Sequence, residues 1–177
     1  NLTNHSYWNL GGETSGSIDD HLLTVAADSV LPCDAASIPV GDPVPVEGSP
    51  LDFRAPARLG DRALADEPVI VAAGGIDHTF VLASGPRAEP EHAATLVDPA
   101  SGRVLEVSTT EPALQVYTGN DLDGTLIGSG GVAYERRAGV ALEAQHAPDS
   151  PNRPSYPTTV LRPGETFRST TVYRLSF

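Results

Sequence analysis

Residues 93–109, AATLVDPASGRVLEVST, carry the clearest fold signal in the chain. Two short apolar runs, 93–97 and 103–109, have the composition of β-strands. They flank Asp98-Pro99-Ala100-Ser101-Gly102, where a proline early and a glycine last are typical of a tight turn. The stretch therefore predicts a β-hairpin.

Short apolar runs separated by Gly and Pro recur along the rest of the sequence, which has 17 Gly and 16 Pro. This punctuation is typical of all-β folds and indicates a sandwich or barrel. Residues 38–51 are too rich in Pro for a central strand, so we expect an extended edge segment with turns at Gly41-Asp42 and Glu47-Gly48. The further strands are predicted at 21–31 (a strand pair, or one strand with a bend), 69–72, 78–83, 113–118, 140–145 and 166–177, and a short helical turn at 58–66.

Length and charge limit the class of protein. A chain of 177 residues is expected to form one domain, 1–177, with one core. The net charge of −12, with no Lys among the 11 basic residues, argues against binding to nucleic acid or to an anionic membrane surface. No stretch is long and apolar enough to span a bilayer. The single Cys33 cannot form an intrachain disulfide, and we expect it to act as a small buried hydrophobe.

The first candidate site is Thr3-Asn4-His5-Ser6-Tyr7, in a polar and aromatic run that suits a pocket better than a core. Period-two geometry places Thr3, His5 and Tyr7 on one face of an extended segment. A histidine between hydroxyl groups can exchange a proton near neutral pH. A hydrogen-bonded structural histidine is the alternative.

Two further candidates lie on predicted strands. Two glycines precede Asp77 and His78 at the start of one strand; because neighbouring strand residues face opposite ways, the two should not share a metal ion. We interpret Asp77 as an acceptor for a polar ligand and His78 as its support, or else Asp77 simply closes a turn. Gln115 and Tyr117 share a strand face, a pairing that suits sugar hydroxyls but is also common on half-exposed strands.

The last candidate is Glu143, which lies with Gln145 on one face of the apolar strand 140–145. A carboxylate inside such a strand is costly unless it is paired or functional. The residues alone therefore favour function slightly.

Several motifs together resemble the aldose 1-epimerase (galactose mutarotase) family. They occur in family order over nearly the whole chain, so the resemblance is specific. It implies an all-β fold, a β-supersandwich of which this chain is expected to be the C-terminal portion. The motifs are NLTNHSYWNLGG at 1–12, HLLTVAADSVLP at 21–32, GIDHTF at 75–80, SGRVLEVSTTEPALQVYTGN at 101–120, LEAQHAPDSPN at 142–152 and LRPGETF at 161–167.

The resemblance also implies an activity, the interconversion of the α and β anomers of free aldohexoses such as galactose and glucose. By the match, His5 is the general acid and Glu143 the general base, while Asp77 and Gln115 hold sugar hydroxyls. No metal or organic cofactor is implied. We expect the acid and base to lie on opposite sides of the sugar, about one ring apart. Unperturbed carboxyl and imidazole pKa values suit these roles at neutral pH.

The chain also departs from the family pattern. The family is longer, and its N-terminal half supplies a second histidine and a substrate-binding arginine that have no counterpart here. We therefore expect self-association or packing against such a half. Trp8 replaces a more usual Phe, and Ala147 stands where a bulkier aromatic is common, so both are expected to reshape the pocket. A cytoplasmic location is expected.

Three other functions compete with this interpretation. A non-catalytic carbohydrate-binding β-sandwich would keep Asp77 and Gln115 but has no use for His5 and Glu143 together. A hexose-phosphate epimerase of the same fold needs a cationic phosphate clamp, which the charge balance disfavours. A glycosidase with two catalytic carboxylates is the third, and a His–Glu pair suits hemiacetal opening better.

Overall fold

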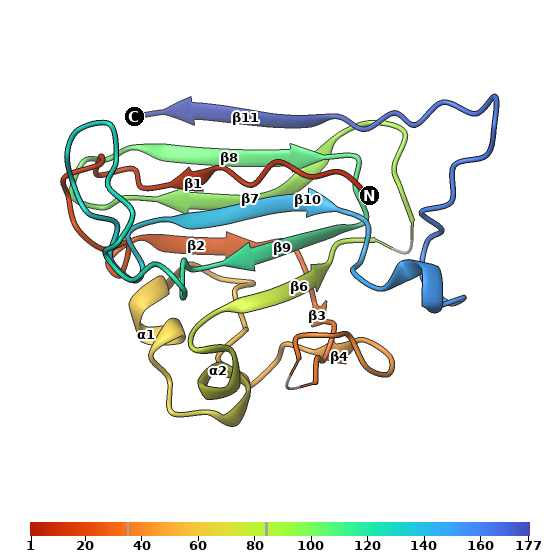
Figure 1. Ribbon diagram of the computed structural model, residues 1–177, viewed down its shortest axis with the longest axis horizontal. Helices are drawn as coiled ribbons and strands as arrows, with labels where there is room; N and C mark the ends of the chain where they lie inside the picture. The colour runs from red at the N-terminus through yellow and green to blue at the C-terminus, as the bar shows by residue number, and fades with distance from the viewer. Residues whose placement is uncertain (35, 84) are drawn as a thin grey trace.

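The computed structural model describes residues 1–34, 36–83 and 85–177, and it consists of two antiparallel sheets (Figure 1). One sheet has the strand order β1-β10-β9-β6-β3-β4 and the other β11-β8-β7-β2-β5, which confirms the expected all-β class. The strands are β1 (Tyr7–Trp8), β2 (Leu22–Val25), β3 (Ser29–Val30), β4 (Val44–Pro45), β5 (Ala57–Arg58), β6 (Asp77–Val81), β7 (Glu91–Val97), β8 (Val104–Thr109), β9 (Ala113–Tyr117), β10 (Val140–Gln145) and β11 (Thr171–Ser176).

The predicted hairpin is β7–β8. Val97 pairs with Val104, and the Asp98 side chain caps the turn by accepting from the backbone N–H groups of Ala100 and Ser101, at 3.1 and 3.2 Å. The turn closes at Gly102, whose φ of 74° favours glycine. The turn predicted from the sequence thus sets the register with which β7 and β8 leave the turn.

The core lies between the two sheets because every long strand turns alternate apolar side chains inward. Leu105 and Val107 of β8 are fully buried, and so are Phe80, Val116 and Leu142 of the facing sheet. The opposite face of the β10-β9-β6 strands is therefore free to carry polar groups.

One predicted strand is wrong. Residues 69–72 belong to the helix α2 (Pro68–Ala73), which lies beside α1 (Leu59–Ala63) at one corner of the sandwich (Figure 1). Pro68 occupies the first helical turn and Gly74, with a φ of 66°, ends the helix. Of the residues in this helix only Ile70 is buried, so packing against the core adds little in favour of a strand. The end signals at Pro68 and Gly74 therefore outweigh the β-branched composition. The predicted helical turn at 58–66 is confirmed by α1.

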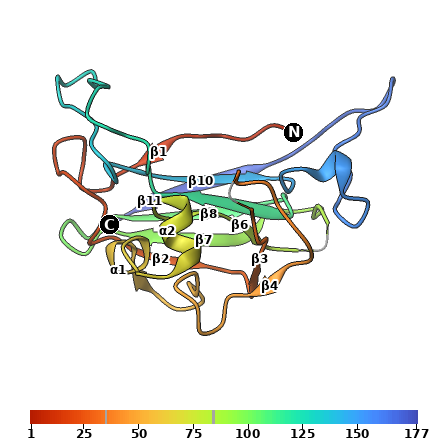
Figure 2. The ribbon, with the colours of Figure 1, turned by 60° about the horizontal axis from the view of Figure 1, so that its bottom comes forward.

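The other segments follow the expectations, with shorter strands. Residues 21–31 contain two strands, β2 and β3, which lie in different sheets, and 38–51 contain the edge strand β4 with turns at Gly41 and Gly48. In the last predicted strand, 166–177, only β11 is paired. The N-terminal run is a strand only at β1, although its earlier residues continue alongside β10 (Figure 2). A 3₁₀ turn, η1 (Ser150–Asn152), follows β10.

Leu142 offers a test of the core. It is fully buried on β10, on the face opposite to Glu143. We expect Leu142→Ala to lower the free energy of unfolding by about 2–5 kcal/mol, because it removes buried methyl groups and leaves a cavity. Urea unfolding followed by circular dichroism measures this loss. A change below about 1 kcal/mol would show that the core does not lie between these sheets.

Candidate active site

Strand register places three of the four predicted site residues, Asp77, Gln115 and Glu143, on the outer face of one sheet. Directly paired residues of antiparallel strands project to the same side, and so do residues two positions apart on one strand. Two neighbouring rows of side chains result. The first row is Tyr7, Ala141, Tyr117 and Asp77, and the second is Glu143, Gln115 and Thr79.

His5 lies next to the second row. Its Nε2 is 3.3 Å from Oε1 of Glu143, with the His5 side chain 47 % exposed and the Glu143 side chain 9 % exposed. The two residues are 138 positions apart in sequence, yet their side chains are in direct contact. The expected separation of about one sugar ring is therefore wrong.

The surroundings of Glu143 suit a proton acceptor. Burial raises the pKa of Glu143 above its usual value of 4.5; nearby His5 acts in the opposite direction, and Asp77 raises the pKa further. A raised pKa makes the carboxylate a stronger base than an exposed glutamate. The burial comes from strand β10, in which Glu143 is flanked by buried apolar residues.

Asp77 and Gln115 form a hydrogen-bonded unit beside this pair. Gln115 Nε2 donates to Asp77 Oδ1 at 2.5 Å, and the Thr79 hydroxyl donates to Gln115 Oε1. Burial raises the pKa of Asp77, and the bond from Gln115 partly offsets that rise. Sequence reasoning missed Thr79, although its position two residues after Asp77 on one strand could have identified it.

Two tyrosines border the contact between His5 and Glu143. The ring of His5 lies 5.1 Å from that of Tyr7 and 5.9 Å from that of Tyr117, centroid to centroid. Burial raises the pKa of Tyr117 to about 12, so its hydroxyl remains protonated and donates to Asp121 at 3.1 Å. Two aromatic rings therefore lie next to the contact between His5 and Glu143.

His78 supports Asp77 from the other face of β6. Its Nδ1 accepts from the Asp77 backbone N–H at 3.0 Å, and burial lowers its pKa to about 4, so the ring is neutral. Over residues 1–34, 36–83 and 85–177 no cluster of three His, Cys, Asp or Glu side chains could hold a metal ion. Cys33 is only partly buried, less than expected, and burial raises the pKa of its thiol.

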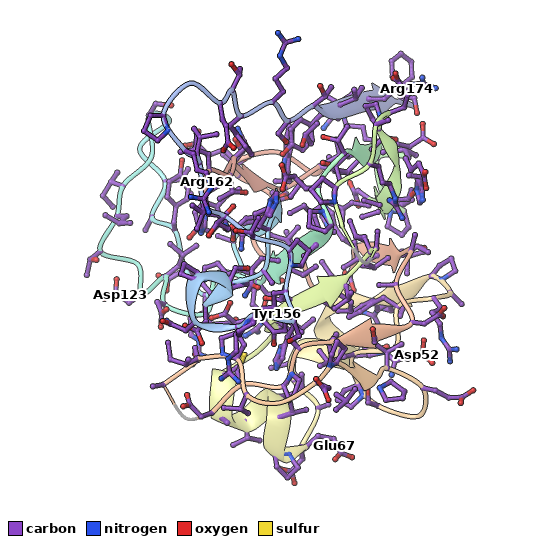
Figure 3. All side chains as sticks on the ribbon, turned by 90° about the vertical axis from the view of Figure 1, so that its right-hand side faces the viewer. Asp52, Glu67, Asp123, Tyr156, Arg162 and Arg174 are labelled. Atoms are coloured by element: carbon purple, nitrogen blue, oxygen red, sulfur yellow. The ribbon has the colours of Figure 1, made fainter. Side chains whose placement is uncertain are left out.

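The two expected changes of pocket shape have different outcomes. Trp8 pairs with Val140 on the core face and its ring packs against Tyr173 at 5.3 Å, so it does not line the site. The expectation is wrong because Trp8 follows Tyr7 directly on β1 and therefore projects to the opposite face of the sheet. Ala147 lines a cavity of about 240 Å³ together with Tyr156, but none of the four candidate site residues lines that cavity, so its effect on the site stays a prediction. Tyr156, labelled in Figure 3, comes from the segment after β10, and its hydroxyl donates to the Gly41 carbonyl at 3.3 Å.

The chain matches the family model described as Aldose 1-epimerase over residues 1–174. It is 47 % identical to mouse galactose mutarotase, with 99 % of this chain and 49 % of the relative covered, and 40 % identical to Escherichia coli aldose 1-epimerase, with 98 % and 50 % covered. The chain thus spans about half the length of these relatives.

Two solved structures share the fold. The GalM/aldose epimerase homologue from Caenorhabditis elegans superimposes with a TM-score of 0.79 at 26 % identity, covering 98 % of this chain and 50 % of that one. Galactose 1-epimerase from Lactobacillus acidophilus gives a TM-score of 0.78 at 30 % identity, covering 98 % and 48 %. With the family model matched over almost the whole sequence, the chain belongs to the aldose 1-epimerase family.

Proposed function

We propose that this chain carries the proton-transferring half of an aldose 1-epimerase, an isomerase that interconverts the α and β anomers of free aldohexoses. Galactose and glucose are the proposed substrates. The observation that supports this most strongly is the 3.3 Å contact between His5 and the buried Glu143 beside a hydrogen-bonded Asp77–Gln115 unit. Residues 1–177 act in this proposal as one domain, the C-terminal portion of such an enzyme.

The proposed reaction begins with two proton transfers at neighbouring oxygens of the sugar. Glu143 takes the proton of the anomeric hydroxyl while protonated His5 gives its proton to the ring oxygen, and the C1–O5 bond breaks to an open-chain aldehyde. Rotation about C1–C2 turns the other face of the aldehyde to O5. The protons then return, from O5–H to His5 and from Glu143 to the carbonyl oxygen, as the ring closes.

The short distance between the two groups supports this scheme. The anomeric oxygen and the ring oxygen are both bonded to C1, so the acid and the base must reach atoms that are themselves close together. Groups on opposite sides of a ring would reach these two oxygens less readily. A contact of 3.3 Å suits two adjacent proton transfers.

Asp77 and Gln115 are proposed to hold sugar hydroxyls in both the ground state and the transition state. We therefore expect Asp77→Asn and Gln115→Ala mainly to raise KM, roughly tenfold, with kcat little changed, as for interactions lost equally in both states. Polarimetry of α-D-galactose at several concentrations separates the two constants. A large fall in kcat at unchanged KM would assign these residues to proton transfer instead.

The competing functions gain no specific support. A carbohydrate-binding β-sandwich does not explain a histidine in contact with a buried glutamate. A glycosidase needs two carboxyl groups flanking the bond, and the partner of Glu143 at contact distance is a histidine.

No helix in the described ranges 1–34, 36–83 and 85–177 is long and apolar enough to cross a membrane.

We propose that the isolated 177-residue chain self-associates through its sheet edges. Among residues 1–34, 36–83 and 85–177, β11 pairs with β8 alone, and its Val172 and Leu175 are 44 % and 62 % exposed. Arg174 projects outward from the same edge (Figure 3). Unpaired edges with exposed apolar residues invite pairing with another chain.

The test is to express this chain with and without any coding sequence that lies upstream. We expect the isolated chain to sediment as dimers or larger species, and to catalyse mutarotation more slowly than the longer product. Sedimentation velocity and polarimetry provide the two readouts. A stable monomer with full activity would contradict this proposal while leaving the acid–base assignment intact.

A further inference from the structure

The segment that carries His5 is held by side chains rather than by a strand ladder. Backbone pairing between β1 and β10 stops at Tyr7 opposite Ala141, and a continued register would place His5 opposite Glu143, where it lies. Over this stretch Thr3 Oγ1 donates to the carbonyl of Ala144 at 3.0 Å. The segment therefore follows β10 without belonging to the sheet.

The far end of this segment is anchored at His146. The side-chain amide of Asn1 donates to the His146 carbonyl at 2.8 Å and accepts from the His146 N–H at 3.3 Å. His146 lies one residue beyond the last paired residue of β10, Gln145. The sheet ladder therefore does not fix the backbone groups of His146, and another contact has to do so.

A buried side-chain pair supplies that contact. His146 Nδ1 lies 2.6 Å from Glu111 Oε2, and both side chains are almost fully buried. Glu111 sits in the tight connection between β8 and β9, where its N–H donates to Thr109 Oγ1 at 3.1 Å. The pair thus ties the end of β10 to the turn that joins β8 of one sheet to β9 of the other, although it touches neither His5 nor Glu143.

We propose that Glu111 and His146 are positioning residues that hold the Asn1–His5 segment so that His5 meets Glu143. This inference rests on the proposed function, because the alignment of His5 with Glu143 matters only if the two groups transfer protons. The His5 side chain is half exposed, and its ring contacts only Tyr7 and Tyr117 among the described aromatic rings. Its position therefore depends on the segment that carries it.

The first test compares Glu111→Ala with Glu111→Gln by polarimetry of α-D-galactose. We expect Glu111→Ala to lower kcat roughly ten- to a hundredfold, the effect of displacing a catalytic group by about 1 Å, with KM changed less than about twofold. Glu111→Gln should retain most activity because its side-chain oxygen still accepts from the His146 ring N–H. Glu89→Ala, at an exposed position, is the matched control and should equal wild type.

A double-variant comparison separates positioning from stability. Glu111→Leu combined with His146→Leu removes the directional contact without leaving a buried charge unpaired, so the fold should persist even where Glu111→Ala does not fold. We expect this variant to lose kcat as Glu111→Ala does. In a His5→Asn background neither change should lower kcat further.

A spectroscopic readout needs no catalysis. In ¹⁵N-histidine-labelled protein, Glu143→Gln should shift the His5 resonances, and this response should disappear in the Glu111→Leu/His146→Leu background. Three results would overturn the inference. They are an unchanged kcat in that background, an equal loss of kcat with and without His5, or a His5 resonance shift that persists there. Wild-type chain that shows the His5–Glu143 coupling but no mutarotation would refute the proposed function alone.

Discussion

Glu143→Gln is expected to lower kcat for α-galactose mutarotation by roughly 10²–10⁴-fold, the usual contribution of a general base. The amide has nearly the same shape and can still contact the sugar, but it cannot accept the proton of the anomeric hydroxyl. KM should therefore change little. Polarimetry of the α-to-β conversion measures both constants, and an active Glu143→Gln protein would refute the assignment of the base.

The pH dependence supplies a second view of the same group. Burial raises the pKa of Glu143 above 4.5, and the base works only when it is ionised. As pH falls through this raised pKa, kcat/KM should therefore decline, and the decline should be centred above pH 4.5. In the wild-type chain this limb reports the buried carboxylate. The same decline at low pH should be absent when the residual rate of Glu143→Gln is measured against pH.

His5→Asn is expected to cost a comparable 10²–10⁴-fold in kcat, because the ring oxygen then loses its proton donor. Asparagine keeps a polar side chain of similar reach, and His5 is half exposed, so the fold should be unaffected. The free energy of unfolding, measured in urea, serves as the control. Equal kcat in His5→Asn and wild type would leave His5 as a structural histidine, the alternative that the sequence also allowed.

His5→Asn and Glu143→Gln should not be additive. Opening the ring requires both protons to move, so removing one group already disables most of what the other contributes. The double variant is therefore expected to be about as slow as the slower single variant. Fully additive losses would show that the two groups act in independent steps.

The sequence predicted the all-β class because turn chemistry and apolar runs are local signals. Asp98 to Gly102 showed this most clearly, since one side chain both caps the turn and sets the register. Residues 69–72 misled the prediction because their β-branched composition was read without the proline and glycine that bound α2. Local end signals can outweigh composition over so short a segment.

The candidate site was predictable only in part. Alternation placed His5 with Tyr7, and Gln115 with Tyr117, on common faces, and the family motifs assigned roles to four residues. No local pattern could show that His5 touches Glu143, because the register that joins them spans 138 positions. For the same reason the Glu111–His146 pair was not found from the sequence, since its members lie on a turn and just past a strand end.

The most direct measurement of the central claim is the initial rate at which this chain interconverts the anomers of α-D-galactose, compared with its His5→Asn, Glu143→Gln and double variants at equal concentration. We expect a catalysed rate for the 177-residue chain, however modest, that falls toward the uncatalysed rate in all three variants. Equal catalysed rates in the wild type and the double variant would contradict it.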